Sequence, residues 1–234
     1  MPLTADTPKP LLPLQSVPLL TYLLKGLKMC GIREAVIVIR YLGEKIIEAF
    51  GDGSELGMSL EYAWQTGHNG TGSAVLAASE LVGDEPFLLT WGDVLMDPEN
   101  YRRILGAYAD HPCDLLSGLN WLDDPSTGAS VSVDSDRIIS IVEKPPVGTA
   151  RSNWNQAGLF ICTKHVLDAM RASELSPRGE IEFTSGVQIL LADGRDVRWS
   201  PVEGLWSDVG TPEALAYLNE SPDVACLRKR ISSV

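Results

Sequence analysis

The chain has 234 residues and a formal net charge of −12 at neutral pH, and 44% of its residues are hydrophobic. This acidic balance argues against a general binder of nucleic acid or of membrane surfaces, since both need a basic face. No apolar run approaches the roughly 18 residues of a membrane span, and the N-terminus lacks a basic start followed by an apolar core. These features predict a globular cytoplasmic protein.

Cysteine and histidine usage gives no metal or redox motif. The four cysteines form no CxxC pair, and the three histidines show no metal-ligand spacing. We therefore interpret the cysteines as thiols of a reducing compartment.

Apolar runs alternate with helical segments over the first 122 residues. The runs at residues 34–39, 58–64, 86–91 and 113–121 are strand-like, and the segments 19–31, 42–50, 70–82 and 99–109 have helical features. This alternation predicts an α/β fold with a Rossmann-like, mostly parallel sheet flanked by helices.

The pattern changes after residue 122. Residues 129–134 and 137–144 predict a hairpin, residues 157–162 a further strand, and residues 164–172 and 181–192 helices, with a last helix at residues 212–218. The intervening stretch 145–158 is long for a loop in a compact domain, so we expect it to cover a site.

Two aspartates follow strand-like runs. Asp93 comes directly after the run at residues 86–91, and Asp208 lies between a short strand and a helix. Ligands of open α/β sheets bind beyond the carboxyl ends of the strands, and Mg²⁺ prefers oxygen ligands. The pair therefore predicts a Mg²⁺ site, although an aspartate can also simply begin a turn.

Two lysines stand beside prolines. Lys9 lies between two prolines, which should make its segment stiff and keep it out of a sheet. Glu143 and Lys144 precede Pro145 and Pro146 in the same manner. A stiff carrier suits a lysine that meets a phosphate, whereas a solvated surface lysine is the structural alternative.

A glycine turn opens the predicted helix at residues 70–82. The segment QTGHNGTGSA (residues 65–74) offers the Gln65 amide and then backbone N–H groups at a helix N-terminus. Such groups attract anions or carbonyl oxygens, but glycine pairs also occur in turns without a ligand.

The order of these motifs resembles the sugar-1-phosphate nucleotidyltransferase family. The motifs PLT-x3-PKPLLP, Q-x4-GTGSA, GD, EKP, N-x-AG and DVGTP follow one another from residue 2 to about residue 218. The resemblance implies that Lys9 contacts the triphosphate, that Asp93 is the main Mg²⁺ ligand and that Asp208 is the second. Gln65, Gly70 and Thr71 would bind the nucleotide, with UTP or dTTP favoured.

The resemblance also assigns a sugar side. Lys144 would bind the sugar phosphate as the second catalytic lysine, and Glu143 and Asn155 would bond sugar hydroxyls. Gly128 would supply a backbone contact to the sugar. We therefore expect a single nucleotidyltransferase domain over residues 1–234, with a nucleotide-binding half at 1–122 and a sugar-phosphate-binding half at 123–220.

The sequence departs from the family pattern at its N-terminus. The family places a β-strand and a GGxGTR loop directly before the PLT segment, so the resemblance is to an N-terminally truncated member without its first strand and loop. The expected reaction joins a nucleoside triphosphate to a sugar 1-phosphate and releases pyrophosphate, with impaired activity in these 234 residues. A misplaced start and a degenerate paralogue are alternative explanations of the truncation.

Alternative functions stay open at this point. The first is a non-catalytic regulatory paralogue that binds a nucleotide sugar, and a remoter one is transfer to a non-sugar phosphate such as phosphocholine. The expected ligands are a nucleoside triphosphate, a sugar 1-phosphate and Mg²⁺, with neither nucleic acid nor membrane as a partner. The sequence is compatible with a homo-oligomer.

Overall fold

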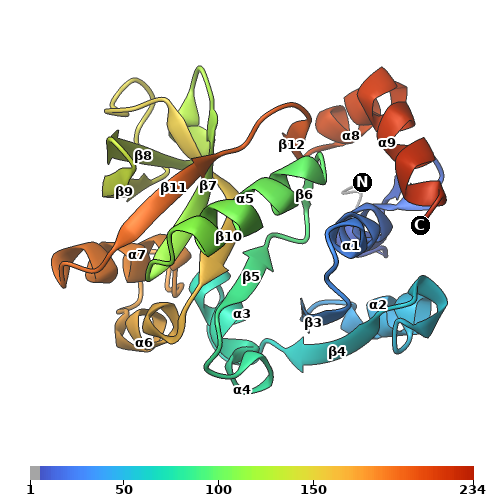
Figure 1. Ribbon diagram of the computed structural model, residues 1–234, viewed down its shortest axis with the longest axis horizontal. Coiled ribbons are helices and arrows are strands. Elements are labelled where there is room, and N and C mark those ends of the chain that lie inside the picture. The colour runs from blue at the N-terminus through green and yellow to red at the C-terminus, as the bar shows by residue number, and fades with distance from the viewer. Residues whose placement is uncertain (1–5) are drawn as a thin grey trace. The chain divides into compact units, whose positions relative to one another are not determined.

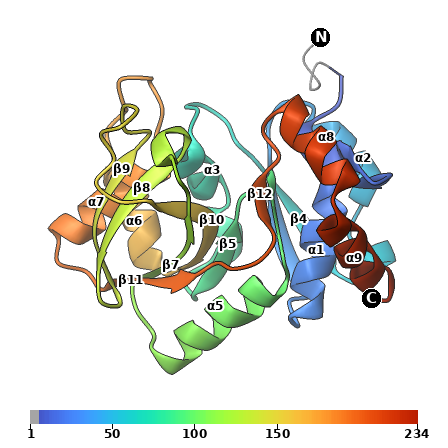
Figure 2. The same cartoon turned by 90° about the horizontal axis from the view of Figure 1, so that it is seen from above.

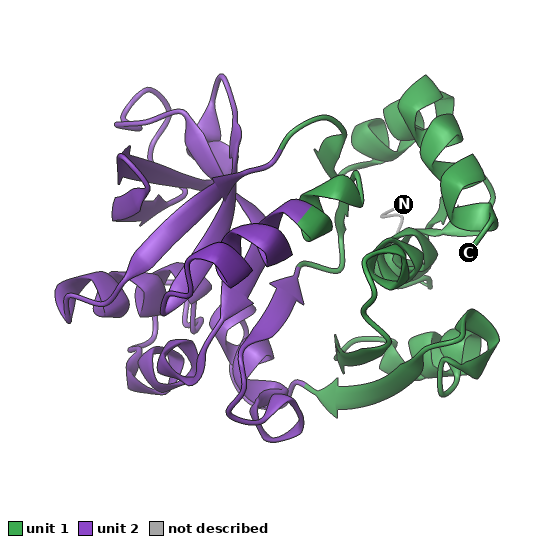
Figure 3. Cartoon of the chain, in the orientation of Figure 1, with its two compact units in different colours: residues 1–64, 91–102, 203–234 green, residues 65–90, 103–202 purple. Residues whose placement is uncertain are grey.

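The computed structural model describes residues 6–234, so the expected PLT segment at residues 2–4 lies outside the described residues. The chain forms two compact units built from separated stretches (Figure 3). Unit 1 comprises residues 1–64, 91–102 and 203–234, and unit 2 comprises residues 65–90 and 103–202. The halves 1–122 and 123–220 that the resemblance implied each contain parts of both units.

Unit 1 is mainly helical and has three short two-stranded ladders. Its helices are η1 (Lys9–Leu11), α1 (Leu19–Met29), α2 (Gly43–Phe50), η2 (Ser54–Leu56), the start of α5 (Glu99–Asp110), α8 (Pro212–Glu220) and α9 (Pro222–Ser232). Its strands are β1 (Pro13–Leu14), β2 (Val17–Pro18), β3 (Glu34–Ile39), β4 (Ser59–Trp64), β6 (Val94–Met96) and β12 (Trp206–Asp208). The pairs are β1–β2, β3–β4 and β6–β12, of which only β3–β4 is parallel.

The core of unit 1 forms around α1. This helix carries apolar side chains around most of its circumference, and its buried residues include Leu19, Leu23 and Leu27. It packs against α9, as Figure 1 shows. Tyr22 of α1 is 2% exposed and donates a hydrogen bond of 2.9 Å to the carbonyl oxygen of Leu14, which fixes the β1–β2 turn against the helix.

Unit 2 holds a six-stranded sheet in the order β5-β10-β7-β11-β9-β8. Its strands are β5 (Phe87–Thr90), β7 (Leu115–Trp121), β8 (Ala129–Asp134), β9 (Arg137–Glu143), β10 (Trp154–Cys162) and β11 (Val197–Pro201). Its helices are α3 (Thr71–Ala77), α4 (Ser79–Val82), the rest of α5, η3 (Pro125–Thr127), α6 (Lys164–Ala172) and α7 (Phe183–Ala192). Figure 2 shows the β8–β9 hairpin at one side of this unit.

The sheet of unit 2 closes on itself. Strand β8 also pairs with β10 at Asn155 and Ser130, so β10, β7, β11, β9 and β8 form a closed circuit of ladders. Phe160 of β10 is fully buried, and its ring packs against the tilted ring of Phe183 of α7 with 4.5 Å between the centroids. Closure leaves few unpaired strand edges and places the ends of several strands around the hairpin.

The α/β class is confirmed, but the sheet is mixed. Within unit 2 only the β11–β7 ladder is parallel, and the ladders of β10 with β5, β7 and β8 and of β9 with β8 and β11 are antiparallel. Aliphatic strand composition reports burial rather than strand direction, so it overestimated the parallel share. Strand β3 is also less buried than its composition suggested, since only Ile39 is buried.

Several predicted boundaries were wrong. The expected helix at 70–82 breaks at Ala78 into α3 and α4, the helix expected from 181 begins at Phe183, and α9 follows the helix expected to be last. Pro13 takes part in the β1–β2 ladder, although the proline-rich segment was expected to avoid sheets. A two-stranded ribbon tolerates this proline because strand edges do not need every N–H group.

We predict that Tyr22→Phe lowers the free energy of unfolding by about 1–2 kcal/mol, because the variant leaves the buried Leu14 carbonyl without this donor. Chemical denaturation measures the change. Tyr217→Phe is the control, since Tyr217 is 74% exposed and should tolerate the loss of its hydroxyl. Equal stability of the Tyr22→Phe variant and the parent would contradict the assigned role.

Candidate functional site

Lys9 and Asp93 form an ion pair in unit 1. The Nζ atom of Lys9, at the start of η1, lies 3.3 Å from Oδ2 of Asp93, and the two side chains are 40% and 36% exposed. This partial exposure leaves both groups accessible to a ligand. The structure thus brings together two of the predicted site residues that are 84 positions apart in sequence.

The β6–β12 ladder carries the two predicted metal ligands. Asp208 pairs with Val94, and the N–H of Val209 donates to the Asp93 carbonyl oxygen at 2.8 Å. Asp93 directly precedes Val94, so Asp93 and Asp208 lie at the same end of the ladder. That both carboxylates bind one ion stays a prediction.

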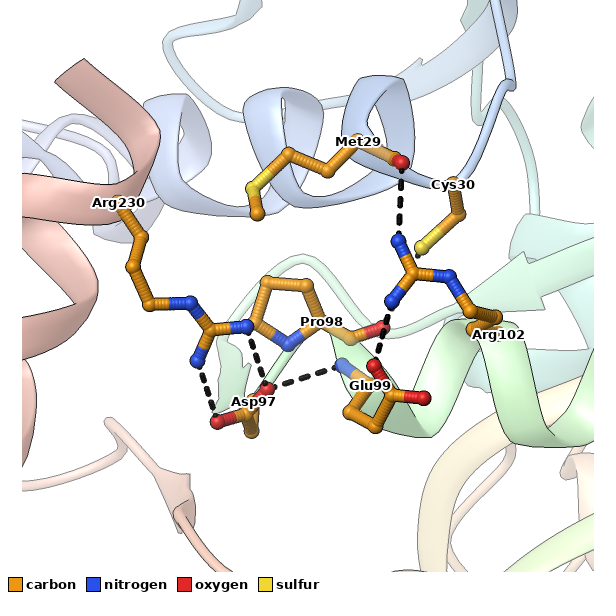
Figure 4. Close-up of polar contacts among 7 residues, drawn as sticks. All are labelled: Met29, Cys30, Asp97, Pro98, Glu99, Arg102 and Arg230. Atoms are coloured by element: carbon orange, nitrogen blue, oxygen red, sulfur yellow. Dashed lines mark hydrogen bonds and ion pairs between the residues drawn. The ribbon is translucent and has the colours of Figure 1, made fainter. Parts of the chain in front are cut away.

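Asp97 fixes the other end of this ladder, and Figure 4 shows its contacts with Glu99 and Arg230. Its N–H donates to the carbonyl oxygen of Leu205 at 2.9 Å, and its Oδ1 accepts from the N–H of Glu99 at the start of α5. Arg230 of α9 donates to both carboxylate oxygens, at 2.8 and 3.2 Å. One side chain thus connects strand β6, helix α5 and helix α9.

Neighbouring contacts add the end of α1 to this cluster (Figure 4). Arg102 donates to the carbonyl oxygen of Met29 at 3.2 Å, and the Cys30 thiol donates to the carbonyl oxygen of Pro98 at 3.3 Å. Burial raises the pKa of the Cys30 thiol, so the group stays a neutral donor. The elements around β6 are therefore cross-linked by polar contacts as well as by the apolar core.

A cavity of about 840 Å³ lies in unit 2. Glu143, the last residue of β9, and the following Lys144 line it, as do Arg178 and Glu182 before α7 and Thr184 in its first turn. These five polar or charged residues thus converge, with further polar residues of the lining, on one space large enough for a small-molecule ligand. The sequence predicted only Glu143 and Lys144 among them.

Arg178 is the centre of the charges in this cavity. Its Nη2 lies 2.9 Å from Glu182, 3.5 Å from Glu180 and 3.7 Å from Glu143. Burial raises the pKa of the Glu143 carboxyl, and the nearby Glu182 raises it further, whereas Lys144, Thr184 and Arg178 act in the opposite direction. Ionisation of Glu143 therefore lowers the stability of the folded state.

Gly128 is hydrogen-bonded to the backbone of Lys144, the second predicted lysine. The N–H of Lys144 donates to the carbonyl oxygen of Gly128 at 2.7 Å, and Lys144 adopts a left-handed backbone with φ of 41°. A Cβ atom at position 128 would stand 2.1 Å from Oδ1 of Asn155, so only glycine fits there. Gly128, Lys144 and Asn155 thus belong to one packed arrangement.

The Asn155 side chain is buried and already engaged. It is 2% exposed, its Oδ1 accepts from the N–H of Ala129 at 3.1 Å, and its Nδ2 donates to Oδ1 of Asn120 at 2.9 Å. Contact between Asn155 and a sugar stays a prediction, but these bonds give it a second task. The bond to Ala129 holds the first residue of β8 next to Gly128.

The next residue has an unsatisfied amide. Nε2 of Gln156 is buried without a hydrogen-bond partner among the described residues, and so is Oγ1 of Thr90. Leaving a buried donor unpaired costs about 1–3 kcal/mol, so a native group of this kind calls for an explanation such as a ligand or a water. Sequence reasoning missed Gln156, although it stands inside the N-x-AG motif.

The glycine turn of residues 65–74 docks on the segment before α7. The Gln65 amide donates to the carbonyl oxygen of Gly70 at 3.0 Å, and Gly70 has φ of 106°. The Thr71 hydroxyl accepts from the N–H of Phe183 at 3.0 Å. The predicted nucleotide-binding residues therefore come together in unit 2, where Gln65 and Thr71 also stabilise the local backbone.

The donor set around Asp93 fits a magnesium ion better than a protein-only metal centre. Within residues 6–234 there is no group of three or more histidine, cysteine, aspartate or glutamate side chains that could hold a metal. Mg²⁺ usually takes one or two carboxylates and completes its shell with substrate phosphates and water. The two predicted ligands, Asp93 and Asp208, match that number.

Comparison with known proteins identifies the family. The family model described as nucleotidyl transferase matches residues 1–223. The chain belongs to this family. The low-salt glycan biosynthesis nucleotidyltransferase Agl11 of Haloferax volcanii is 30% identical over 221 residues, which are 94% of this chain and 61% of that protein.

Two further comparisons agree. The glucose-1-phosphate thymidylyltransferase of Streptomyces griseus is 30% identical over 222 residues, or 93% of this chain and 61% of that enzyme. A crystal structure of UDP-glucose pyrophosphorylase with UDP-glucose superposes with a TM-score of 0.82 at 20% identity, covering 96% of this chain and 92% of that one, which shows the fold.

These comparisons confirm the resemblance to sugar-1-phosphate nucleotidyltransferases. The chain spans about three fifths of the length of the first curated relatives it matches. Among the described residues, no helix is long and apolar enough to cross a membrane.

We predict that Arg230→Gln loosens the β6–β12 ladder, because Asp97 loses a bidentate partner and α9 loses its attachment. The unfolding free energy should fall by about 1 kcal/mol, as expected for an ion pair whose side chains are 37% and 30% exposed. Hydrogen exchange should accelerate at the amides of Asp97 and Val209, which bridge the two strands. Arg228→Gln on the exposed side of α9 should leave both amides unchanged, and equal exchange in the two variants would contradict the role.

We predict that Glu143→Gln stabilises the protein by about 0.5–1 kcal/mol at neutral pH, a size usual for removing a strained functional charge. The folded state raises the pKa of Glu143, so ionisation lowers stability as pH rises through the window above the ordinary carboxyl value. The melting-temperature difference from the parent should therefore shrink towards pH 4. Glu61→Gln, at an exposed position of β4, is the control. A lower melting temperature at neutral pH would contradict the assignment.

Proposed function

We propose that the chain forms the catalytic body of a sugar-1-phosphate nucleotidyltransferase that uses UTP or dTTP and Mg²⁺. The observation that carries the proposal is the convergence of Lys144, Arg178 and Glu143 on one cavity. Cations that can bind a phosphate there stand beside a carboxylate that can accept hydrogen bonds from hydroxyl groups. A sugar phosphate combines both kinds of group.

The reaction needs positioning and charge neutralisation rather than proton transfer. An oxygen of the sugar phosphate attacks the α-phosphorus of the nucleoside triphosphate, and the bond from that phosphorus to the pyrophosphate oxygen breaks. The attacking phosphate is already an anion at neutral pH, so no general base is required. The barrier lies in bringing two anions together in line.

The cationic side chains are suited to that task. In the proposed reaction Lys144 and Arg178 hold the sugar phosphate, and Lys9 neutralises charge on the triphosphate. Mg²⁺, held by Asp93 and Asp208, would supply further neutralisation of phosphate oxygens when bound. Lys9 already pairs with Asp93, which keeps its flexible side chain close to the proposed metal ligand.

The nucleotide base is assigned to the turn at Gln65, Gly70 and Thr71. A glutamine amide offers both a donor and an acceptor, which matches the edge of uracil or thymine. The relative from Streptomyces griseus is described as a thymidylyltransferase, in agreement with this choice. The Gln65 amide can exchange its present bond to the Gly70 carbonyl oxygen for one to a base.

The sugar is assigned to Glu143, the backbone of Gly128 and the Asn155–Gln156 segment. Asn155 is engaged with Ala129 and Asn120, so its main part in the proposal is to hold Gly128 in position. Gln156 offers the unsatisfied amide, and a sugar hydroxyl or ring oxygen is a fitting acceptor for it.

The experiment that tests the function is an assay of pyrophosphate release. The 234 residues contain no GGxGTR segment, and we expect them alone to turn over slowly. A chain with a GGxGTR strand-loop placed before Pro2 should react at least about 100-fold faster, since charge-assisted backbone bonds are worth about 1.5–3 kcal/mol each. A graft with alanine in place of the loop glycines is the matched control.

Variants of the grafted chain test the assigned roles. Asp93→Ala and Lys144→Ala should abolish turnover while melting temperatures stay near the parent value, and Lys164→Ala should be active because that lysine is an exposed residue of α6. Wild-type rates in either of the first two variants would refute the roles. A grafted chain that binds UDP- or dTDP-sugar without turnover would favour the regulatory paralogue instead.

We predict that Gln156→Leu in the grafted chain raises the KM for sugar 1-phosphate about tenfold and leaves the KM for the nucleoside triphosphate unchanged. The same change should raise the melting temperature slightly, because it removes a buried donor without a partner. Steady-state kinetics and thermal unfolding measure the two effects. A loss of stability with both KM values unchanged would show that the amide serves the fold and not the sugar.

A further inference from the structure

The outer face of the β8–β9 hairpin is lined with hydroxyl groups. Along these strands, Ser130 is opposite Val142 and Ser132 is opposite Ser140, so the four side chains share one face of the hairpin. The other face carries buried aliphatic residues such as Val131 and Ile141. The hydroxyl face is therefore not part of the apolar core.

The loop after Lys144 encloses this face. A second cavity of about 340 Å³ lies between the serines and the loop residues Pro145, Pro146, Thr149 and Arg151. Thr149 donates its hydroxyl to the Pro146 carbonyl oxygen at 2.7 Å, which tightens the turn in the loop. The walls of this cavity combine hydroxyl groups and the Arg151 guanidinium with apolar surface from Val142, Pro145 and Pro146.

The lining of the second cavity carries only positive charge. Arg151 is its only ionisable side chain, although the protein as a whole carries 31 acidic against 19 basic residues. Among the described residues Arg151 has neither an ion pair nor a hydrogen bond, and the hydroxyls of Ser132 and Ser140 likewise have no protein partner. A guanidinium group and two hydroxyl donors are thus available to one acceptor.

We propose that this second cavity binds the phosphate group of a small molecule. Guanidinium and hydroxyl donors match the acceptor-only oxygens of a phosphate, and no carboxylate in the lining repels it. Free inorganic phosphate and a phosphate monoester share this chemistry. The site is separate from the substrate cavity because Ser132, Ser140 and Arg151 line only the second one.

The two cavities share a wall. Val142 lines both, Glu143 and Lys144 line the first, and Pro145 lines the second. Lys144 is held in a left-handed conformation directly before this proline. A phosphate in the second cavity therefore contacts the same short segment that carries the charged groups of the first.

Titration of the 234-residue chain with inorganic phosphate, followed by calorimetry and amide NMR shifts, tests the proposal. Arg151→Gln should weaken binding about tenfold or more, and the Ser132→Ala/Ser140→Ala double variant should weaken it by a smaller factor. Arg195→Gln, another exposed arginine in the turn before β11, should bind like the parent. In the parent, the shifts should centre on residues 130–132, 140 and 149–151.

Lys144→Ala separates this site from the substrate cavity. Binding that survives in Lys144→Ala and is lost in Arg151→Gln supports the proposal. Binding that is lost in Lys144→Ala and kept in Arg151→Gln overturns it, as does the absence of any phosphate-dependent shift in the parent at millimolar concentration. A parallel titration with glycerol 3-phosphate distinguishes the source, because tighter binding than that of inorganic phosphate identifies a monoester as the ligand.

Discussion

The antiparallel ladder between β6 and β12 is the constraint on which the arrangement of unit 1 depends. These strands have only three residues each, and the segments that carry them are about 110 positions apart in sequence. Apolar burial of Leu95 anchors one strand in the core, and Asp97 locks its end through bonds to Leu205, Glu99 and Arg230. A three-residue ladder would be weak in isolation. Because the cluster around Asp97 holds one end, the segment at the other end can keep Asp93 partly exposed and still in a fixed position.

In unit 2, charges of both signs lie close together beside a cavity. Arg178 neutralises Glu143, Glu180 and Glu182 in part, but burial still raises the pKa of Glu143. A site optimised for stability alone would not keep four ionisable groups there, since exchanging them for apolar residues is often neutral or favourable. Their presence is understandable if a ligand completes the network. In the proposed reaction, the sugar phosphate competes with the carboxylates for Arg178, and the sugar hydroxyl groups give the carboxylates new donors.

Sequence reasoning predicted the elements better than their pairing. The hairpin of β8 and β9 and the helix α6 follow directly from period-two alternation and from apolar periodicity, which are local signals. The mixed direction of the sheet was not predictable in this way, because strand direction depends on connections and closure. Helix α9 was missed since Ser221 and Pro222 signal a stop as well as a new start. Among the site residues, Arg178 was missed because it stands in an irregular segment, and only its position four residues before Glu182, the N-cap of α7, could have pointed to it. The unsatisfied amide of Gln156 could not be foreseen, because burial is a property of the folded chain.

The spacing of the motifs in unit 2 has a mechanical origin. Closure of the sheet buries Asn155 beside Ser130, and the Asn155 amide then fixes Ala129 at the start of β8. The adjacent Gly128 accepts from the N–H of Lys144, so the same closure fixes the lysine. Three motifs that are separate in sequence are therefore successive links of one hydrogen-bonded chain, with Gly128 in the middle because no Cβ atom fits there.

Hydrogen bonds between buried groups tolerate little displacement, so a change at any link moves the others. This explains how residues with quite different roles in the proposed reaction come to depend on the same few contacts. Asn155 fixes Ala129 and, with it, the adjacent Gly128. Gly128 in turn fixes the backbone of Lys144, which lines the substrate cavity.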